Sequence, residues 1–393
     1  MDTEFATRCI HLPEEKQLKD RYGAMTFPIY QTATFAHPGP GRSTGYDYSR
    51  SMNPSRDYVE RVVASLEEGC GAIAASSGMA AVSLVMELFS PGDTILIDSD
   101  LYGGSLRLFR HIGEKNGLRF RKINCSTDPV ADAADATTKA IFLETPSNPT
   151  MRVSDIAAIA SAARGKGLLL IVDNTFLSPC FQKPLTLGAD LVIHSGTKYL
   201  GGHNDTLAGF VAVKDPELEE RLRFLHKTTG AVLAPLDCYL ITRGIKTLPI
   251  RMRQAEENAV RLAHWLRQRK EVTRVYYPGL EDHPGHETMK RQASGFGAMI
   301  SFETATREQA LSLLEGIRLI SYAESLGGVE SLLTYPLTQT HADVPEDERL
   351  ANGINDRLLR LSVGIEDAND LIRDLEQALD AYTERQNGKK PEL

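Results

Sequence analysis

The sequence lacks the long apolar runs, the abundant cysteines and the excess of positive charge that mark three large classes of protein. No stretch of its 393 residues approaches the roughly 18 consecutive apolar residues of a membrane span, and residues 1–17 do not resemble a signal peptide. The five cysteines are far apart and form no CxxC pair, which is typical of free thiols in a reducing compartment. A formal net charge of −8 disfavours binding to nucleic acid. We therefore expect a soluble, cytoplasmic protein with neither a nucleic-acid nor a membrane partner.

The composition is that of an ordinary globular protein, with 42% hydrophobic and 24% charged residues, and the length suggests two or three domains. Residues 1–50 carry few periodic apolar runs but many turn formers, notably between His37 and Gly45. We interpret them as an extended N-terminal arm that packs on another surface. Because the pattern changes again near residue 240, we expect one domain over residues 51–240 and another over 241–393.

The first of these domains alternates short apolar runs with helical patterns. The runs typical of buried strands lie at 72–75, 94–97, 140–143, 168–172 and 191–193. The helical patterns lie at 79–89, 105–115 and 154–164, and one more helix runs from Asp57 to a closing Gly69. Buried strands separated by helices indicate an α/β fold with a mostly parallel sheet that is covered on both faces.

The pattern of the second domain indicates a smaller domain of the α+β type. Its helical patterns lie at 255–269, 306–314 and 371–382, and its strand patterns at 272–277 and 298–302. The two histidines of His283-Pro-Gly-His286 have no further ligands nearby in the sequence, so we expect no metal.

Polar residues end each predicted strand of the first domain, and ligands of open α/β sheets bind beyond the carboxyl ends of the strands. The small residues of Ser76-Ser-Gly78 join a strand to a helix, where free backbone N–H groups can bind an anion. A merely tight turn would look the same. The segment matches neither GxGxxG nor a P-loop, which argues against a dinucleotide enzyme and an NTPase.

Two further strand ends carry residues with catalytic chemistry. Asp173 follows a very apolar run and needs a cationic or proton-donating partner, unless it only caps a turn. Lys198 lies among small and hydroxyl residues, where desolvation and a nearby pyridinium would lower its pKa and provide a neutral amine. A lone lysine after a strand is usually solvated, but a phosphate turn, an acid and such a lysine together are what pyridoxal 5′-phosphate (PLP) requires.

Here the chain resembles a known family, the Cys/Met-metabolism or trans-sulfuration family of PLP enzymes, from about Thr26 to Tyr382. Seven motifs carry the resemblance, in family order: Tyr48-Ser-Arg50-x-x-Asn53-Pro54, Ser77-Gly78-Met79-Ala80, Asp100-Leu-Tyr102-Gly103-Gly104, Glu144-Thr-Pro-Ser-Asn148-Pro149, Val172-Asp173-Asn-Thr175, His194-Ser-Gly-Thr-Lys198-Tyr-Leu-Gly-Gly-His203 and Arg360-Leu-Ser-Val-Gly-Ile-Glu-Asp367. The resemblance implies the aspartate-aminotransferase-like architecture called fold type I, with PLP as cofactor.

The resemblance also implies which residues bind PLP. Lys198 would be the Schiff-base lysine, Asp173 would keep the pyridinium nitrogen protonated, and Tyr102 would stack on the ring. The phosphate would be held by Gly78, Met79, Ser195 and Thr197. Tyr48 and Arg50 would complete this cup in the neighbouring subunit of a homotetramer built from two dimers, which explains the extended arm.

Substrate recognition is likewise implied by the resemblance. Arg360 would bind the α-carboxylate as a two-pronged donor, and Asn148 and Ser325 would orient substrate and cofactor. Glu324 resembles the acid that recognises the distal amino group of cystathionine in γ-synthases and γ-lyases. Asp47 and Arg107 resemble further residues that recognise this end of the substrate.

Among family members, we expect a cystathionine γ-synthase that joins an O-acylhomoserine to cysteine and also accepts sulfide. Gly104 stands where methionine γ-lyases typically carry a cysteine, which weakens that alternative. The alternatives that stay open are cystathionine γ-lyase, a β-lyase, an O-acetylhomoserine sulfhydrylase and, outside enzymes, a catalytically silent regulatory protein. The expected partners are O-acylhomoserine, cysteine, cystathionine and further copies of the chain.

Overall fold

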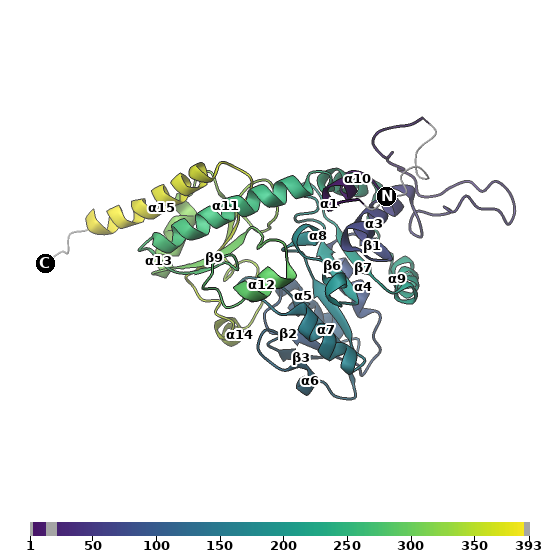
Figure 1. The fold of residues 1–393 in the computed structure, drawn as a ribbon, viewed down its shortest axis with the longest axis horizontal. Coiled ribbons are helices and arrows are strands. Elements are labelled where there is room, and N and C mark those ends of the chain that lie inside the picture. Colours follow the sequence, from purple (N-terminus) through teal and green to yellow (C-terminus); the bar gives the residue numbers. More distant parts are fainter. Residues whose placement is uncertain (1–2, 13–21, 389–393) are drawn as a thin grey trace.

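Two β-sheets organise the chain in this computed structural model, which describes residues 3–12 and 22–388 (Figure 1). The first sheet has seven strands in the order β1-β7-β6-β5-β4-β2-β3. Their bounds are β1 Gly71–Ala75, β2 Thr94–Asp98, β3 Arg119–Ile123, β4 Thr138–Glu144, β5 Leu169–Asp173, β6 Leu191–Ser195 and β7 Gly209–Val213. Only β7 runs antiparallel to its neighbours, β1 and β6. The expected mostly parallel sheet is therefore confirmed.

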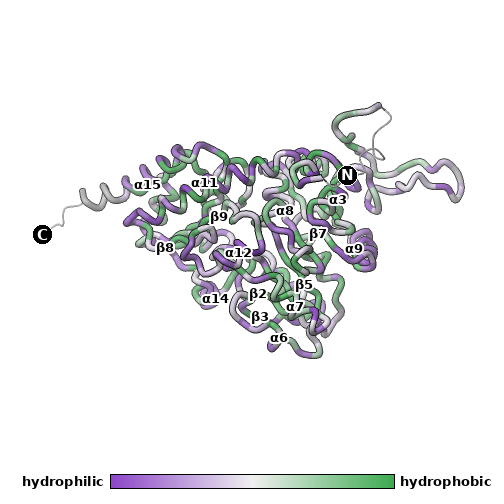
Figure 2. The backbone as a smooth tube through the Cα atoms, viewed as in Figure 1, coloured by the Kyte–Doolittle hydropathy of each residue, from purple (hydrophilic) through white to green (hydrophobic). Residues whose placement is uncertain are grey.

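Helices cover both faces of this sheet because its strands are apolar on both sides. One face packs against the helices α3 Pro54–Glu67, α7 Ile156–Gly165, α8 Ser178–Phe181 and α10 Pro235–Ile245. The other packs against α4 Gly78–Met86, α5 Gly103–Leu108, the π-helix η1 Phe109–Gly113 and α9 Pro216–Thr229. The short elements α6 Val130–Ala133 and the 3₁₀-helix η2 Pro184–Leu187 both contact α7. Figure 2 shows hydrophobic colour on β5 and β7 and hydrophilic colour on the outer helix α9.

The second sheet has five strands in the order β10-β11-β12-β9-β8 and is mostly antiparallel. Its strands are β8 Val272–Tyr276, β9 Met299–Thr304, β10 Ser321–Tyr322, β11 Leu332–Thr334 and β12 Leu358–Ser362. The helices of this half are α11 Leu248–Gln268, α12 His286–Gln292, α13 Arg307–Gly316, α14 Glu346–Ala351 and α15 Ala368–Gly388. The boundaries expected at residues 50 and 240 lie outside both sheets and stay predictions. We call residues 51–240 the large domain and residues 241–393 the small domain.

Several local predictions differ from the structure. Helix α3 begins at Pro54, behind the capping side chain of Asn53, and the left-handed residue at its end is Glu68 rather than Gly69. Gly69 is required for another reason: a Cβ there would lie 2.5 Å from the carbonyl oxygen of Val213 on β7. The helix expected over 105–115 is split into α5 and η1, and α11 begins seven residues earlier than expected, at Leu248.

The N-terminal segment has two parts with different surroundings. Residues Phe5–Arg8 form the short helix α1, and the adjacent Cys9 and Leu12 are buried against the large domain, so this part is not extended. Residues 22–50, which we call the arm, project from the body in Figure 1 and double back on themselves through a bridge between Thr34 and Tyr48. The rest of the predicted arm, residues 1–2 and 13–21, lies outside the described residues.

No helix within residues 3–12 and 22–388 is long and apolar enough to cross a membrane. Within the same residues, no group of three or more histidine, cysteine and carboxylate side chains is arranged to hold a metal ion. His283 and His286 each use one ring nitrogen in a local bond, with the N–H of Gly285 and the carbonyl oxygen of Pro278.

Candidate active site

The carboxyl ends of three adjacent strands bring the candidate catalytic residues together. In the sheet register Glu144 at the end of β4 pairs with Asp173 at the end of β5, and Asp173 pairs with Ile193 on β6. The chain leaves β6 at Ser195 and reaches Lys198 one turn later. We call Tyr102, Glu144, Asp173, Ser195 and Lys198 the strand-end cluster.

Within the described residues, the Asp173 side chain accepts both of its hydrogen bonds from Thr175. Its Oδ1 accepts hydrogen bonds from the backbone N–H of Thr175 at 3.0 Å and from the Thr175 hydroxyl at 2.5 Å. The same hydroxyl accepts the N–H of Ser195 at 2.9 Å, so Thr175 ties the end of β5 to the end of β6. Burial raises the pKa of Asp173, and the two bonds from Thr175 oppose that rise. A cationic partner facing Asp173 would therefore stabilise its charged form.

Tyr102 is positioned by Glu144. The backbone N–H of Tyr102 donates to Glu144 Oε2 at 3.0 Å, which sets the residue at the start of α5. Burial, and then the charge of Asp173, raise the pKa of the Glu144 carboxyl. A Cβ at Gly104 would lie 2.4 Å from the Tyr102 ring and 3.1 Å from the sulfur of Met79. Gly104 therefore lets the ring pack closely while 38% of Tyr102 stays exposed for a stacking partner.

A cradle of small residues lies between α4 and the end of β6. Ser77 caps α4 by accepting the N–H of Ala80 at 3.1 Å. A Cβ at Gly78 would lie 2.9 Å from the Ser195 Cβ, and one at Gly209 would lie 2.0 Å from the Ser77 carbonyl oxygen. Side chains at these two glycines would fill the cradle. The free N–H groups at the start of α4, beside the hydroxyl of Ser195, form a site suited to a phosphate.

Lys198 points across to the small domain. Its Nζ donates to the hydroxyl of Ser325 at 2.9 Å. Burial and the charge of Arg360 lower its pKa to about 8, although Glu324 acts in the opposite direction. Ser325 has a φ of 127°, a backbone conformation that non-glycine residues rarely adopt and that is typical of functional sites. The neutral amine is therefore accessible near physiological pH.

Arg360 is a buried cation that lacks a carboxylate within ion-pair distance among the described residues. It lies on β12 and is only 2% exposed. Its Nη1 donates to Asn148 Oδ1 at 2.8 Å, and its Nη2 to the carbonyl of Ser325 at 3.1 Å and the hydroxyl of Thr334 at 3.3 Å. Its Nε has no partner in the described part of the chain. A guanidinium held in this way is ready to bind a carboxylate.

A cleft of about 880 Å³ opens beside Lys198 and Ser325. Thr197 and Asp237 line it from the large domain, and Glu324 and Glu330 from the small domain. Glu324 is exposed on this wall, immediately before the residue that holds Lys198. The cleft therefore presents the carboxylate of Glu324 next to Ser325, whose hydroxyl holds the amine of Lys198.

Four of the residues predicted from the sequence lie apart from this assembly or are engaged elsewhere. Asp47 pairs with Ser43 at 2.5 Å and His37 at 3.6 Å within the exposed arm. Tyr48 is 47% exposed, and Arg50 donates to the backbone carbonyl of Lys227. Arg107 forms an ion pair with Asp343 of the small domain at 2.5 Å. Their predicted roles stay predictions.

Several residues that support the cluster were absent from the predicted site. Glu144 and Thr175 belong to the motifs quoted above, and their positions at strand ends were the signal that could have found them. Glu67 had no such signal, because it lies on α3, more than a hundred residues from its partner. Its Oε1 lies 2.5 Å from His194 Nε2, both side chains are fully buried, and Asn174 also donates to Glu67. The two partners of Glu67, His194 and Asn174, directly adjoin Ser195 and Asp173 in the sequence.

These residues fit pyridoxal 5′-phosphate. The cradle at Gly78 would hold its phosphate, and the exposed face of Tyr102 would stack on its ring. The buried Asp173 would face its protonated nitrogen, and Lys198 would bond to its aldehyde carbon. The protein is thus a PLP enzyme of fold type I, with a mostly parallel large sheet and a second, smaller sheet.

The chain belongs to the family described as Cys/Met metabolism PLP-dependent enzymes, whose family model matches residues 6–380. It is 47% identical to a cystathionine γ-lyase of Bacillus subtilis (strain 168), over 92% of this chain and 96% of that one. It is 49% identical to a cystathionine γ-synthase/O-acetylhomoserine (thiol)-lyase of the same organism, over 91% and 92%. A cystathionine γ-synthase of Xanthomonas oryzae pv. oryzae, solved with aminoacrylate and cysteine, superposes with a TM-score of 0.94 at 42% identity, covering 98% and 100%. The protein is therefore a trans-sulfuration enzyme of the cystathionine γ-synthase, γ-lyase and β-lyase type.

Proposed function

We propose that this enzyme is a cystathionine γ-synthase that joins an O-acylhomoserine to cysteine at Cγ and also accepts sulfide in place of cysteine. The observation that carries the proposal is the exposed carboxylate of Glu324 in the cleft beside Lys198. It is suited to the amino group of cysteine. The γ-synthase and thiol-lyase activities in the name of the Bacillus subtilis relative support the same reading.

Four residues hold the cofactor and substrate in this proposal. Bound PLP withdraws electrons from the Cα of an amino acid. Asp173 keeps the proton on the ring nitrogen, and Tyr102 packs on the ring. Arg360 binds the α-carboxylate with its free donor, oriented by Asn148. These contacts align the Cα–H bond toward Lys198.

Lys198 moves the protons of the reaction. Its lowered pKa lets the neutral Nζ take the Cα proton. It then carries a proton from Cβ as the γ-acyloxy group leaves, and returns a proton after the thiol has added at Cγ. The bond to Ser325 holds the amine in place between these steps.

The phosphate cup of each site is completed by Tyr48 and Arg50 of a second copy of the chain in this proposal. Their arm is exposed and carries large apolar side chains at the surface, including Met25 at 87% exposure and Tyr22 at 81%. A second copy packed on the arm would bury these side chains, and two such dimers would form the tetramer. The cytoplasmic location stays a prediction.

Cystathionine γ-lyase is the second candidate, favoured by the Bacillus subtilis relative and by a Lactobacillus plantarum γ-lyase structure that superposes with a TM-score of 0.94 at 43% identity. The same residues would serve both reactions, with Glu324 binding the distal amino group of cystathionine. Assays of the holoenzyme with O-acetylhomoserine, O-succinylhomoserine and cystathionine side by side separate the two. We expect the γ-replacement with cysteine to be the fastest, and faster cystathionine cleavage would favour the lyase.

Glu324→Gln tests the proposed distal contact. The rate with cysteine should fall about ten- to a hundredfold, because a charge-assisted hydrogen bond becomes a neutral one. The rate with sulfide, which has no amino group, should be largely kept. Glu330→Gln is the matched control, because Glu330 lines the same cleft but pairs with Asn204 at 2.8 Å. An equal fall with cysteine and sulfide would mean that Glu324 acts through Ser325 on the cofactor site.

A further inference from the structure

A second large cavity, of about 910 Å³, lies between the large and small domains. The large domain contributes the loops that follow β3 and β4, including Asn124 and Arg152. The small domain contributes β8, the loop 280–285 and the end of α14. None of its lining residues belongs to the candidate active site. The cavity does lie beyond carboxyl ends of strands of the first sheet, where ligands of such folds bind.

Three arginines and one aspartate line this cavity, so its charge is positive. Arg267 is neutralised by Asp282, whose carboxylate lies 3.0 Å away. Arg152 donates to Ser99 and Asn352, and its Nε lies 3.7 Å from the buried Asp100. Arg274, in contrast, contacts an aromatic ring and no carboxylate of the described residues.

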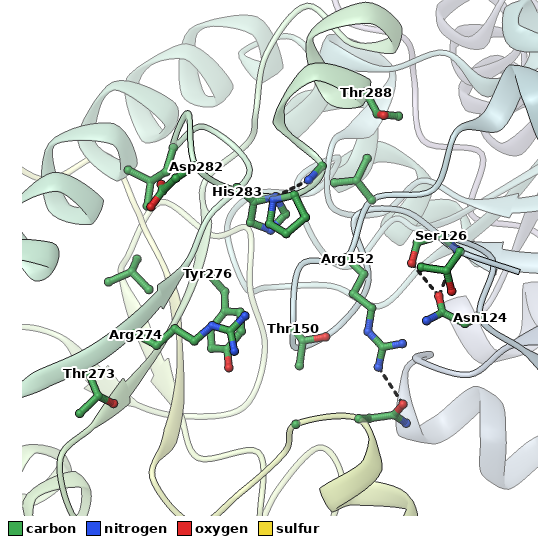
Figure 3. A pocket seen from close by; sticks show the side chains of 18 of the residues that line it. Asn124, Ser126, Thr150, Arg152, Thr273, Arg274, Tyr276, Asp282, His283 and Thr288 are labelled. Atoms are coloured by element: carbon green, nitrogen blue, oxygen red, sulfur yellow. Dashed lines mark hydrogen bonds between the residues drawn. The ribbon is translucent and has the colours of Figure 1, made fainter.

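Arg274 lies over the ring of Tyr276, with its guanidinium carbon 4.5 Å from the ring centre. Among the described residues no carboxylate lies within ion-pair distance of it. In Figure 3 the side chains of Arg274, His283 and Arg152 surround the same space. Burial, with smaller contributions from His286 and Arg274, lowers the pKa of His283 to about 4 against the opposing effect of Asp282, so the imidazole is neutral at pH 7. Arg274 thus faces a cavity in which the lining carboxylate, Asp282, is already paired with Arg267.

The opposite wall offers a neutral donor. Asn124 Oδ1 accepts the N–H of Ser126 at 3.1 Å and its hydroxyl at 2.6 Å, which leaves the amide NH₂ group toward the cavity (Figure 3). The cavity therefore has donors on both walls, Arg274 on the small domain and Asn124 and Arg152 on the large one.

One loop connects this cavity to the active site. Thr150 and Arg152 line the cavity, whereas Asn148, two residues earlier, accepts the hydrogen bond from Arg360. Between them the carbonyl of Pro149 accepts the hydroxyl of Ser301, on β9 of the small domain, at 2.6 Å. The interdomain contact at Pro149 thus lies between the cavity and the bond that joins Arg360 to Asn148.

We propose that this interdomain cavity is a regulatory site for a compact polyanion, a phosphate ester or diphosphate in chemical class, which bridges Arg274 and the Asn124–Arg152 wall. Because the anion and the substrate favour the same domain arrangement, each strengthens the binding of the other. The anion site itself does not depend on which trans-sulfuration reaction the enzyme catalyses.

The test uses the holoenzyme, in which the PLP phosphate already fills the cradle at Gly78, with inorganic pyrophosphate as the probe. Calorimetric titration at constant ionic strength, in a buffer without phosphate, should show binding to wild type. Arg274→Ala should weaken that binding at least about tenfold, because it removes the unpaired cation. Arg261→Ala is the matched control, an exposed arginine on α11 that pairs with Asn369 outside the cavity. The affinity of Arg261→Ala for pyrophosphate should equal that of wild type.

A second readout measures the coupling. Saturating pyrophosphate should lower the KM of the amino-acid substrate about fivefold in wild type and in Arg261→Ala, and leave it unchanged in Arg274→Ala. The absence of binding at millimolar pyrophosphate, or equal binding by Arg274→Ala, would overturn the site. Binding without any fall in KM would overturn its regulatory role. A wrong assignment of the catalysed reaction would alter the substrate used in this assay but not the titration.

Discussion

The two halves of the proposed cofactor site have opposite surroundings. The strand-end cluster is enclosed by both domains, and its polar groups are bonded within the chain, as in the chain of contacts from Ser195 through Thr175 to Asp173. The arm that carries Tyr48 and Arg50 is exposed along most of its length and bonded mainly to itself. One half is complete in a single chain, and the other needs a surface that this chain does not provide.

Because of this difference, substitutions in the two halves should affect stability and catalysis differently. In the buried half a substitution removes packing or leaves a charge without a partner, so the fold and the reaction suffer together. In the exposed half a substitution changes few contacts within the chain. Its effect should therefore appear in catalysis alone.

Lys198→Ala breaks the buried half at its reactive atom and should have the largest effect. We expect turnover to fall by about 10⁴-fold or more, because both the covalent amine and the proton carrier are lost. Lys183→Ala is the control, since Lys183 pairs with Glu68 at the surface and should leave the rate unchanged. Steady-state assays, with circular dichroism to verify folding, make the measurement. Appreciable turnover of Lys198→Ala without added amine would refute the role of this lysine.

His194→Leu breaks the buried half behind the reactive atoms. It leaves the buried carboxylate of Glu67 with only the longer bond from Asn174, which should reduce the free energy of unfolding by about 3–5 kcal/mol. Arg50→Ala, on the exposed half, should change it by less than about 0.5 kcal/mol. Urea unfolding of both holoenzyme variants makes the comparison. Similar losses in the two variants would remove the distinction between the halves.

The pH dependence of cofactor attachment sharpens the description of the buried half. Because the pKa of Lys198 is lowered to about 8, its amine is mostly protonated below pH 8 and mostly neutral above it. The rate at which PLP becomes covalently attached to the apoenzyme should rise with pH and level off above this midpoint. Stopped-flow absorbance measures it, and apo Lys198→Ala corrects for attachment elsewhere. A rate that still rises steeply beyond pH 10 would indicate an ordinary, solvated lysine.

Mixing two inactive variants tests the exposed half. If Arg50 acts in the site of a second copy, Arg50→Ala and Lys198→Ala subunits form one intact site in each mixed dimer. Random reassembly should then restore about a quarter of wild-type activity. Each variant reassembled alone is the control. Mixed dimers verified by mass spectrometry that stay inactive would place Arg50 in its own subunit's site.

Much of the strand-end cluster could be predicted because local signals mark it. Apolar runs locate the strands, and the parallel arrangement sends their polar ends to one edge, so Asp173 and Lys198 followed from pattern and resemblance together. The edge strand β3 was missed because its exposed residues, Arg119, Arg121 and Lys122, hide the apolar period. β7 was also missed, although residues 210–213 form an apolar run of the kind that marks the other buried strands.

Contacts between distant segments could not be predicted, because nothing in the local sequence marks them. Glu67 and His194 lie 127 residues apart in the sequence and meet only in the folded chain. Arg107 carries a charge that the resemblance assigned to a substrate, yet in the folded chain Asp343 lies within 2.5 Å of it.

The amino-acid sequence by itself determined the alternation of strands and helices, the residues at the strand ends and the family, because these depend on neighbours along the chain. Only the tertiary structure decided which hydrogen-bond partners those residues have and how deeply they are buried. The buried Arg360 with a free Nε, the lysine held by Ser325, and the cavity around Arg274 arise where the small domain meets the large one. Charge and burial at such a contact depend on side chains far apart in the sequence, which no local pattern encodes.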